Sequence, residues 1–530
     1  MNSSLKKTIT ALLAALFLLS AFSGCKKASE TAEEEPLPDD LMNEYSEESD
    51  RYAADNVFSL NCNKDFSFNP FSTTNASNIL CTQVMYDRLF EVDDTFEYTG
   101  SLVSSFSSED GKTWRFYIDD SVKFWDGSTL TAADASYSVQ RAMQSPQFKS
   151  RLINIIGVSA ADSKQFIINL NSADMMFPAL LTIPVIKYGT VSENAPMGTG
   201  PYMPNEDFSE LNLFADYRLA DSMPVDTIYL KEFKQIEAVI TAFENSEIDL
   251  VTNDPTGFFN VGYGTANESR YYPTTHMHYL GFNVNGGFFA APLARKAMNY
   301  VVNREHIVVD ILNGAATEAT LPMHPACQYY NDKFSEIVSY SAAKSQMAFD
   351  DANVQDYDDD GFREIMVNGI PMESNIKFIV CNDSVSKVSA ARAIADNLTA
   401  LGIKVTLYEL PWLEYNYTLN QSDFDMYYAE TSLTADFSLR ELLFYGGKLN
   451  YGRVNDQTLT DNVNAYLTSL PEGRQLAADI MFKYITDTAP IVPICFEKQQ
   501  VITHRGAVTG LSPTQYNVFG DLENWEISIG

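Results

Sequence analysis

The sequence predicts an α/β protein with a parallel sheet. Its C-terminal half alternates strand patterns with helical patterns, and the segments in order are Asn375–Val380, Ser386–Leu401, Ile403–Tyr408, Pro411–Leu419 and Phe424–Tyr428. A βαβαβ order of this kind implies parallel strands joined by right-handed crossovers. The length of 530 residues and the apolar fraction of 45% indicate two or three globular domains.

The end of the third strand is the first candidate site. In open parallel sheets, ligands bind outside the carboxyl ends of the strands. The polar turn Ala429–Asp436 leaves such an end. We therefore expect Asp436 to face a ligand, while Glu430 adds negative charge nearby.

The N-terminus resembles an export signal. Lys6 and Lys7 precede the apolar run Ile9–Phe22, which is too short to span a bilayer. The small residues before Cys25 resemble a bacterial lipobox, so residues 1–24 would be a signal peptide and Cys25 would be lipidated. The alternative is an ordinary secretory signal in which Cys25 has no role. Residues 25–55 are acidic and poor in apolar side chains, which predicts a disordered tether.

Charge and cysteine content argue against three classes of protein. Acidic residues outnumber basic ones 70 to 36, and this net charge of −34 argues against a nucleic-acid partner. The cysteines after Cys25 are widely spaced, which favours neither a disulfide framework nor a cysteine metal site. We expect Cys381 and Cys495 to be buried free thiols, because each follows an apolar run.

The N-terminal half predicts a mixture of hairpins and helices. Asp110–Gly111 is a hairpin turn, and the alternation of Trp114, Phe116 and Ile118 indicates a half-buried strand. Thr131 and Asp134 form a capping box that opens a helix. Further expected elements are a helix at Ile79–Phe90, a strand at Phe166–Leu170, a strand-entry turn at Met197–Tyr202 and a helix at Ile236–Phe243.

Three more elements follow. A strand is expected at His276–Asn283, and the final strand pattern is Ile491–Phe496. Between them, Pro292 should begin a long helix that ends at Asn313–Gly314.

The order of motifs resembles the family 5 extracellular solute-binding proteins, the substrate-capturing lipoproteins of peptide-importing ABC transporters. The resemblance runs from about Phe68 to Val518. The segments that carry it are Ser108–Phe116, Val122–Asp134, Gly198–Tyr202, Gly281–Asn283, Arg295–Tyr300 and Ala489–Pro493.

The resemblance implies a bilobed, periplasmic-binding-protein-like clamp of type II with the three-domain arrangement of family 5. Its first lobe would combine residues 56–90, 184–275 and 489–530, residues 91–183 would be a small appended domain, and residues 276–488 would form the second lobe. Ligand would bind between the lobes, and a hinge would close over it.

The resemblance also implies site residues. Peptide-binding members hold the ligand's α-ammonium group with an aspartate in an Ala-Asp-aromatic step, which Ala435, Asp436 and Phe437 match. Trp412 would pack against ligand side chains, and Thr199 in the Gly-Thr-Gly turn is a further candidate contact. Leu433 stands where the family commonly has Trp, which leaves the cargo less certain than the fold.

Two clusters raise the question of metal binding. Asp356, Asp358 and Asp360 have the alternate spacing of a calcium loop, but Val367 replaces the bidentate Glu at the twelfth position. A solvated turn is the alternative to structural calcium. His276 and His278 share one face of a strand, but no cysteine or carboxylate lies at a zinc-like spacing, which favours a polar connecting strand over a metal site.

These observations lead to one expected function. The chain contains no nucleophile elbow, metalloprotease pair or phosphate loop, so we do not expect an enzyme. We expect a monomeric receptor that captures peptides for ABC permease subunits, has no resident cofactor beyond the possible calcium, and is anchored by Cys25 on the outer side of a bacterial cytoplasmic membrane. The alternatives are a different cargo, such as an oligosaccharide or chelated nickel, and a peptide-sensing surface receptor.

Overall fold

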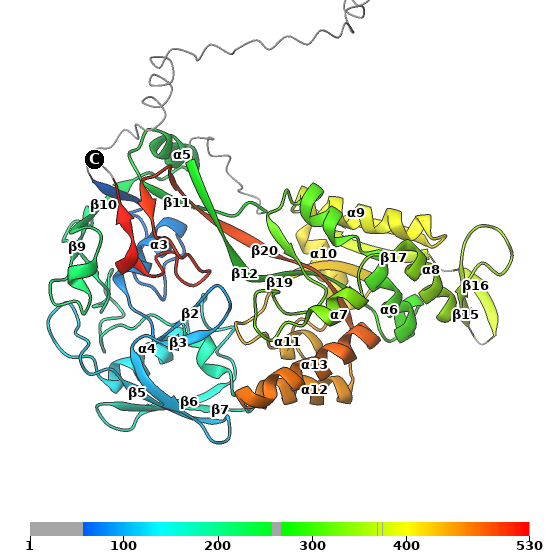
Figure 1. Cartoon of the computed structure of the whole chain (residues 1–530), viewed down its shortest axis with the longest axis horizontal. Coiled ribbons are helices and arrows are strands. Elements are labelled where there is room, and N and C mark those ends of the chain that lie inside the picture. The colour runs from blue at the N-terminus through cyan, green and yellow to red at the C-terminus, as the bar shows by residue number, and fades with distance from the viewer. Residues whose placement is uncertain (1–56, 257–266, 368, 374, 529–530) are drawn as a thin grey trace, which may run out of the picture. The chain divides into compact units, whose positions relative to one another are not determined.

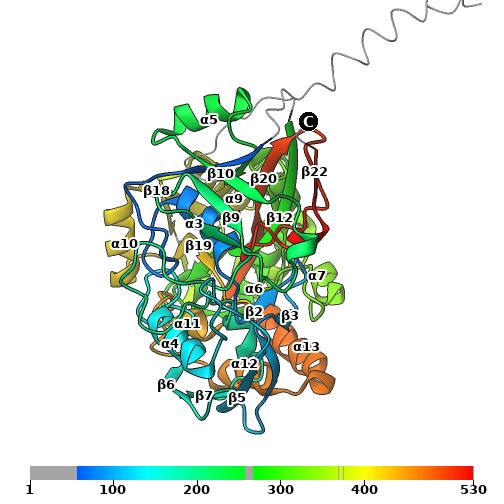
Figure 2. The same ribbon diagram turned by 90° about the vertical axis from the view of Figure 1, so that its left-hand side faces the viewer.

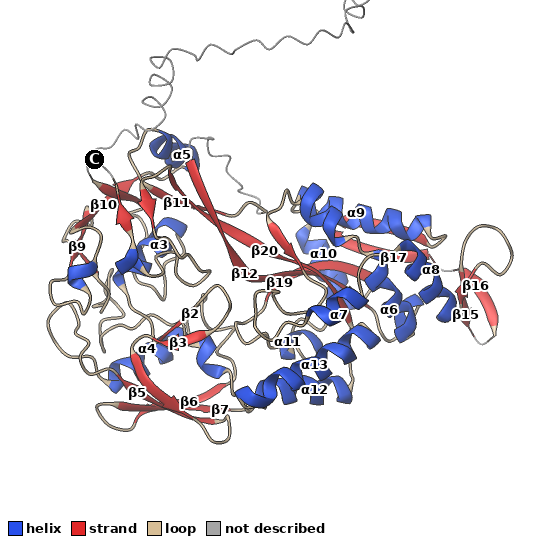
Figure 3. Ribbon diagram, viewed as in Figure 1, coloured by secondary structure: helices blue, strands red, loops and turns tan. Residues whose placement is uncertain are grey.

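The largest sheet of the computed structural model has seven strands, and two long strands occupy its centre (Figures 1 and 3). The structure describes residues 57–256, 267–367, 369–373 and 375–528. The long strands are β12 (Asn267–Phe282) and β20 (Ile491–His504), which run antiparallel and lie side by side in both views (Figure 2). The strand order is β11-β20-β12-β19-β17-β18, where β11 is Leu250–Asn253, β19 is Met426–Ser432, β17 is Asn375–Cys381 and β18 is Lys404–Leu410. Strand β13 (Ala316–Glu318) also pairs with β20.

The predicted βαβαβ unit is confirmed. Its elements are β17 (Asn375–Cys381), α9 (Val385–Ala400), β18 (Lys404–Leu410), α10 (Trp412–Gln421) and β19 (Met426–Ser432). Strand β17 pairs in parallel with both β18 and β19. Gly402 follows α9 with φ of 80°, the left-handed conformation that a glycine adopts without strain.

The sheet is buried on both faces in this region. Phe378 and Val380 of β17 belong to one hydrophobic core, whereas Ile379 between them belongs to another. Successive side chains of a strand point to opposite faces, so these two cores lie on opposite sides of the sheet. This double burial explains why the strand is a nearly continuous apolar run.

The third strand of the unit is longer than the sequence indicates. The turn was expected to begin at Ala429, but β19 continues to Ser432 because it pairs with β12 over its whole length, ending at the pair His276–Ser432. This pairing satisfies the backbone groups of the polar segment Glu430–Ser432. The turn therefore begins at Leu433.

The long helix expected from Pro292 is interrupted. Helix α6 (Pro292–Val301) ends before the π-helix η4 (His306–Ile311). Buried Arg304 lies in the break, where it donates hydrogen bonds to the carbonyl oxygens of Asn299 (3.2 Å) and Pro493 (2.9 Å). The Arg304 guanidinium thus donates to the carbonyl oxygen of Asn299, which in a continuing helix would accept a hydrogen bond from the backbone.

The N-terminal half contains two four-stranded sheets. The first is β4 (Val103–Ser107), β5 (Thr113–Ile118), β7 (Gln165–Leu170) and β6 (Ile155–Ala160), with the predicted hairpin between β4 and β5. The second is β1 (Phe58–Cys62), β10 (Thr227–Glu232), β9 (Glu210–Leu213) and β8 (Tyr202–Pro204). Helix α4 (Ala132–Ala142) has the predicted capping box. Helix α3 (Ala76–Met85) begins and ends earlier than expected, because the backbone is extended from Tyr86 and leads into β2 (Phe90–Val92).

The remaining strands and helices complete the fold. The strands are β2 (Phe90–Val92), β3 (Tyr98–Gly100), β11 (Leu250–Asn253), β14 (Val354–Gln355), β15 (Glu364–Val367), β16 (Ile370–Glu373), β21 (Val508–Thr509) and β22 (Glu526–Ile527). The helices are η1 (Phe177–Leu180), η2 (Ala220–Ser222), α5 (Ile236–Glu244), η3 (Phe288–Ala290), α7 (Asp332–Ile337), α8 (Ala342–Asp351), α11 (Arg440–Leu443), α12 (Gln457–Thr468), α13 (Pro471–Thr488) and η5 (Leu522–Asn524).

One hydrophobic core joins segments that are far apart in sequence. It contains Phe58 of β1, Phe116 of β5 and Trp525 near the C-terminus, so the predicted first lobe and the small appended domain share their core. The proposed domain boundaries stay a prediction. The predicted signal peptide and tether lie outside the described residues.

Cys381 and Cys495 are buried free thiols, as expected. Within the described ranges, none of the helices combines the length and apolar character needed to cross a membrane.

Candidate functional site

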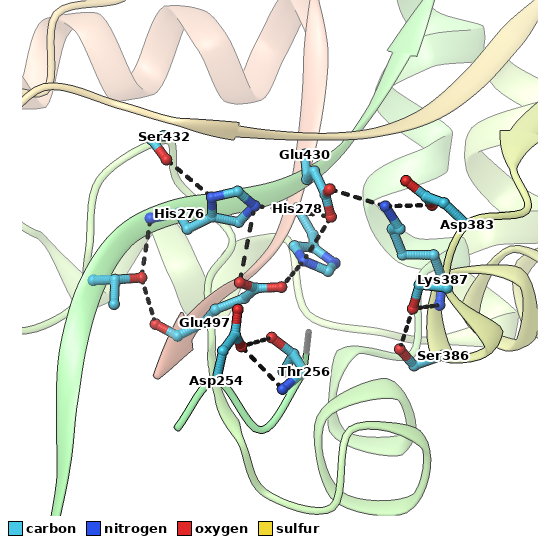
Figure 4. A network of polar contacts seen from close by, with 12 residues as sticks. Asp254, Thr256, His276, His278, Asp383, Ser386, Lys387, Glu430, Ser432 and Glu497 are labelled. Carbon is cyan, nitrogen blue, oxygen red and sulfur yellow. Dashed lines mark hydrogen bonds and ion pairs between the residues drawn. The ribbon is translucent and has the colours of Figure 1, made fainter. Parts of the chain in front are cut away.

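The candidate site is a polar cavity of about 670 Å³ beside the centre of the large sheet. Strands β12, β19 and β20 and the start of α9 contribute to its lining. We call this cavity 1, and the side chains used in the argument below are His276, His278, Asp383, Lys387, Glu430 and Glu497 (Figure 4). Three paired strands of the large sheet thus supply four of these six side chains.

The strand register explains how the two histidines meet two glutamates. His276 and His278 project from the same face of β12 because they are two residues apart. On β19, Glu430 lies directly opposite His278. On β20, Glu497 lies within an irregularity of the pairing with β12, and its Oε1 is 2.7 Å from Nε2 of His278.

Ion pairs hold this cluster together. Nζ of Lys387 lies 2.8 Å from Oε1 of Glu430 and 2.7 Å from Oδ1 of Asp383. Burial by itself would raise the pKa of Glu430, but the neighbouring His276 and Lys387 lower it well below its usual range. Both glutamates are therefore carboxylates at neutral pH, since His278 likewise outweighs burial and lowers the pKa of Glu497.

The same charges act on His276. Burial would lower its pKa, but the contact with Glu430 and the charge of Glu497 raise it above the ordinary value. The whole lining of cavity 1 contains four carboxylates, from Asp254, Asp383, Glu430 and Glu497, against the two cations of Arg151 and Lys387. Such a surplus favours a ligand that presents positive charge.

A second cavity of about 350 Å³, called cavity 2, adjoins cavity 1. The two cavities share the lining residues Ser150, Arg151, Ser432, Leu433 and Thr434. Asp436 lines cavity 2, together with Asp174 and Arg440. The turn after β19 therefore separates the histidine cluster from a second group of carboxylates.

Asp436 is held by its own turn. Its Oδ1 accepts hydrogen bonds from the hydroxyl of Thr434 and from the backbone N–H of Ser438 (3.1 Å). Only 1% of Asp436 is exposed. Burial, and next the carboxylate of Asp436, raise the pKa of Asp174 well above its usual range. Two adjacent acids of this kind can share a proton or hold a cationic group between them.

The other residues of the expected Ala-Asp-aromatic step are buried around Asp436. Ala435 and Phe437 belong to the hydrophobic core, and the Phe437 ring packs edge-on against Phe96 and Phe496. Phe437 has φ of 51°, so the backbone is left-handed directly after Asp436. This packing fixes the direction of the Asp436 carboxylate. Leu433, at the start of the same turn, lines both cavities.

Trp412 and Thr199 lie elsewhere. Trp412 is 57% exposed at the start of α10, with its ring 6.4 Å from that of Tyr415. Thr199 is fully buried between Gly198 and Gly200, and both glycines pack tightly against Met85 and Tyr86. Neither residue is among those that line cavity 1 or cavity 2.

The acidic loop lies between β14 and β15. Oxygen atoms of Asp356, Asp358, Asp360 and Glu364 all lie within 4.8 Å of one another. Glu364 stands at the ninth position of this loop, whereas the twelfth position, where a calcium loop has its bidentate Glu, is Val367. Cys25, the expected lipidation site, lies outside the described residues.

The lining of cavity 1 includes residues that the sequence patterns did not indicate. Asp383 and Lys387 lie four residues apart at the start of α9, but no local spacing connects either of them with Glu497 of β20. One signal was present for Glu497. It continues the final apolar strand pattern as its first charged residue, which marks the place where that strand leaves the core.

Three comparisons with known proteins agree with this fold. The family model described as bacterial extracellular solute-binding proteins, family 5 middle, matches residues 97–445. A Brucella ovis protein named as an ABC transporter peptide-binding protein is 26% identical over 313 residues, which is 54% of this chain and 58% of that protein. The chain thus matches less than two thirds of the length of this curated relative.

Solved structures show the same fold at low identity. The unliganded open form of MppA, a periplasmic murein tripeptide binding protein, has a TM-score of 0.73 at 16% identity and covers 89% of this chain and 98% of its own. NikZ from Campylobacter jejuni, in complex with Ni(L-His), has a TM-score of 0.62 at 18% identity, with coverage of 89% and 99%. Since the family model spans more than half of the chain, the protein belongs to the family 5 bacterial extracellular solute-binding proteins.

Proposed function

We propose that the protein is the solute-binding component of an ABC importer and that it captures oligopeptides. Membership of the family supports solute binding, and the name of the Brucella ovis relative supports peptides as the cargo. The observation that carries the proposal is the pair of adjoining cavities, one of which presents the buried carboxylate of Asp436. The ligand would lie along both cavities with its ammonium group at Asp436.

The energetics of this arrangement are favourable for a cationic terminus. An ammonium group that loses water needs an ionised partner, and a hydrogen bond to a charged group contributes about 1.5 to 3 kcal/mol. Sequence-tolerant capture would come from main-chain hydrogen bonds to an extended ligand. Ser432 at the end of β19 and Thr434 in the turn after it lie in the wall shared by the two cavities.

Isothermal titration calorimetry with a mixed pool of short peptides tests the proposal. The protein should bind peptides that have a free N-terminus, and N-acetylation of the same peptides should weaken binding at least tenfold. Absence of heat with the whole pool, for protein that circular dichroism shows to be folded, would contradict the proposal.

The N-terminal segment completes the proposed role. A lipid on Cys25 would hold the protein at the outer surface of the cytoplasmic membrane, and residues 25–55 would let the body reach the permease as a monomer. The family is extracellular, which fits this location. Fractionation of cells that make the Cys25→Ser protein should move it from the membrane to the soluble exported fraction, whereas unchanged membrane association would contradict the anchor.

The second candidate is a different cargo bound by the same fold. A sensing role without transport is a further alternative. NikZ holds a nickel–histidine complex in the same fold, and the two histidines in the wall of cavity 1 make a metal-containing cargo chemically reasonable. Native mass spectrometry of freshly purified protein separates the cargo candidates, because a peptide, a sugar and a metal chelate differ in mass and isotope pattern.

A further inference from the structure

Four side chains converge on one point in the wall of cavity 1. Ligand atoms of His276, His278, Glu430 and Glu497 all lie within 4.8 Å of one another (Figure 4). They come from three strands, β12, β19 and β20, that pair within one sheet. Their relative positions are therefore fixed by backbone hydrogen bonds.

Both imidazole rings are held at the nitrogen that faces away from this point. Nδ1 of His276 lies 2.9 Å from the hydroxyl of Ser432, and Nδ1 of His278 lies 2.7 Å from the hydroxyl of Tyr428. A metal-bound histidine typically uses its second nitrogen in this way, which fixes the ring and leaves Nε2 for the ion. Both Nε2 atoms point at the glutamates.

The distances suit a small divalent ion. Nε2 of His276 lies 3.8 Å from Oε2 of Glu430 and 3.8 Å from Oε2 of Glu497. Nε2 of His278 lies 3.6 Å from Oε2 of Glu430. A tetrahedral ion with bonds of about 2.1 Å separates its ligand atoms by about 3.4 Å. A shift of a few tenths of an ångström would therefore complete the site.

One short contact would be replaced. Nε2 of His278 lies 2.7 Å from Oε1 of Glu497, a hydrogen bond whose proton occupies the place of the ion. Metal binding displaces protons from its ligands, and two carboxylates balance the charge of a divalent ion. Oε1 of Glu430 stays paired with Lys387, which orients its other oxygen.

We propose that His276, His278, Glu430 and Glu497 bind a divalent transition-metal ion such as Zn²⁺ or Ni²⁺ in the wall of cavity 1. Two imidazoles and two carboxylates are a donor set that suits ions of this class. Facing the cavity, the ion would hold solutes that carry chelating amine and carboxylate groups. Only this last step rests on the proposed function, since the site itself requires no peptide.

Metal titration without any solute tests the site. The purified protein, treated with a chelator and dialysed, is titrated with ZnCl₂ and NiCl₂ by calorimetry. We expect one ion per chain, and His276→Gln should weaken binding at least tenfold. His306→Gln is the matched control, because His306 is an exposed histidine paired with Asp310 on η4 and should leave the affinity unchanged.

Further measurements keep the test decisive. If His276→Gln does not fold, Glu430→Gln replaces it, because that side chain is one-third exposed. Bound Co²⁺ should give the visible absorption of a four- or five-coordinate ion in the wild type and in His306→Gln, but not in the site variants. Wild-type metal affinity no greater than that of the site variants would overturn the inference. Peptide binding without metal binding would support the proposed function and contradict the metal site. Metal binding without peptide binding would support the metal site and contradict the proposed function.

An independent observation concerns the acidic loop Asp356–Glu364. Glu364 is only 3% exposed, and its Oε2 accepts a hydrogen bond from the backbone N–H of Tyr357 (2.8 Å). Within the described residues, its other oxygen, Oε1, is buried without a hydrogen-bond partner. A buried carboxylate oxygen without a partner is costly unless a cation neutralises it.

The geometry points to a calcium ion bound by Asp356, Asp358, Asp360 and Glu364. Calcium prefers carboxylate oxygens in flexible arrangements of this kind. Gly361, with φ of 92°, allows the sharp turn between the third and fourth ligands.

Thermal unfolding after removal of bound calcium tests this second inference. Adding Ca²⁺ should raise the melting temperature of the wild type and of Glu373→Gln, an exposed control on β16 that pairs with Lys404. The same addition should leave Glu364→Gln unchanged. A wild-type melting temperature that does not respond to calcium would overturn the inference, as would an equal rise in Glu364→Gln.

Discussion

Nε2 of His278 lies 2.7 Å from Oε1 of Glu497, although 219 residues separate them in the chain. The contact exists because β12 and β20 pair at the centre of the large sheet. It places a buried histidine and a carboxylate in the wall of cavity 1, at the point where both long strands carry polar side chains. The chemistry of the site therefore depends on the pairing of two distant strands.

Asp436→Asn should weaken the binding of peptides that have a free N-terminus. Loss of a hydrogen bond to a charged group costs about 1.5 to 3 kcal/mol, which corresponds to roughly a 10- to 160-fold loss of affinity. The amide keeps an oxygen that can accept from Ser438, so the turn should persist. Calorimetry with one tight-binding peptide measures the change.

The control for this variant is Asp461→Asn, which removes an exposed carboxylate on α12. It should bind the peptide as the wild type does. Equal affinity of Asp436→Asn and wild type for the free peptide would remove Asp436 from the proposed ammonium site.

Gly200→Ala should destabilise the protein by about 1 to 3 kcal/mol, the usual cost of overpacking. A Cβ atom at this position would lie 2.5 Å from the backbone carbon of Met85, which cannot move aside easily. Chemical denaturation measures the loss. Gly286→Ala is the control, because a Cβ there meets nothing within 4 Å, and a similar loss in both variants would refute the close-contact explanation.

The pH dependence of stability should contain a contribution from His324. Burial, and next the charge of Lys498, lower its pKa to about 4, whereas an unfolded histidine titrates near 6.5. The unfolded state therefore binds more protons between these values, so stability is full above pH 6.5 and falls as the pH drops toward 4. The slope is at most about 1.4 kcal/mol per pH unit.

His324→Asn tests this contribution. The Asn oxygen can accept from the backbone N–H of Ala326, as Nδ1 of His324 does at 3.0 Å. We expect lower stability at pH 7, because the ring contacts with Phe96 and Phe496 are lost, and a flatter curve between pH 4 and 6.5. Parallel curves for variant and wild type would show that other groups cause the acid sensitivity.

The resemblance implies that Trp412 contacts ligand side chains, although the residue lines neither cavity. On that expectation, Trp412→Ala should reduce affinity for peptides with large apolar side chains while changing stability by less than about 0.5 kcal/mol. More than half of the ring is exposed, so little packing is lost in the free protein. Tyr417→Ala on the same helix is the control, since that ring is exposed as well. If both variants bind such peptides as tightly as the wild type does, Trp412 is not a ligand contact.

Much of the fold could be predicted because its signals are local. The patterns that predicted the strands and helices of the βαβαβ unit, the hairpin at Asp110–Gly111 and the capping box at Thr131 each involve residues within a few positions of one another. The end of β19 could not be predicted, because its polar residues are strand only through pairing with β12. The break after α6 depends equally on a distant partner, the carbonyl group of Pro493.

The candidate site shows the same limit. Sequence patterns indicated Asp436 and predicted that His276 and His278 share a face of one strand. No pattern predicted a carboxylate close to the two histidines. Glu430 and Glu497 reach them only when β12 is paired on both sides. Glu364 could not be predicted for a different reason. A calcium loop has its bidentate Glu at the twelfth position, whereas Glu364 stands at the ninth.

Native mass spectrometry of the protein after incubation with a defined pool of short peptides tests the central claim most directly. The account predicts that each wild-type chain binds one peptide that has a free N-terminus. Asp436→Asn should show much lower occupancy at the same concentrations. Wild-type protein that is folded and yet carries no peptide from the pool at any concentration tested would contradict it.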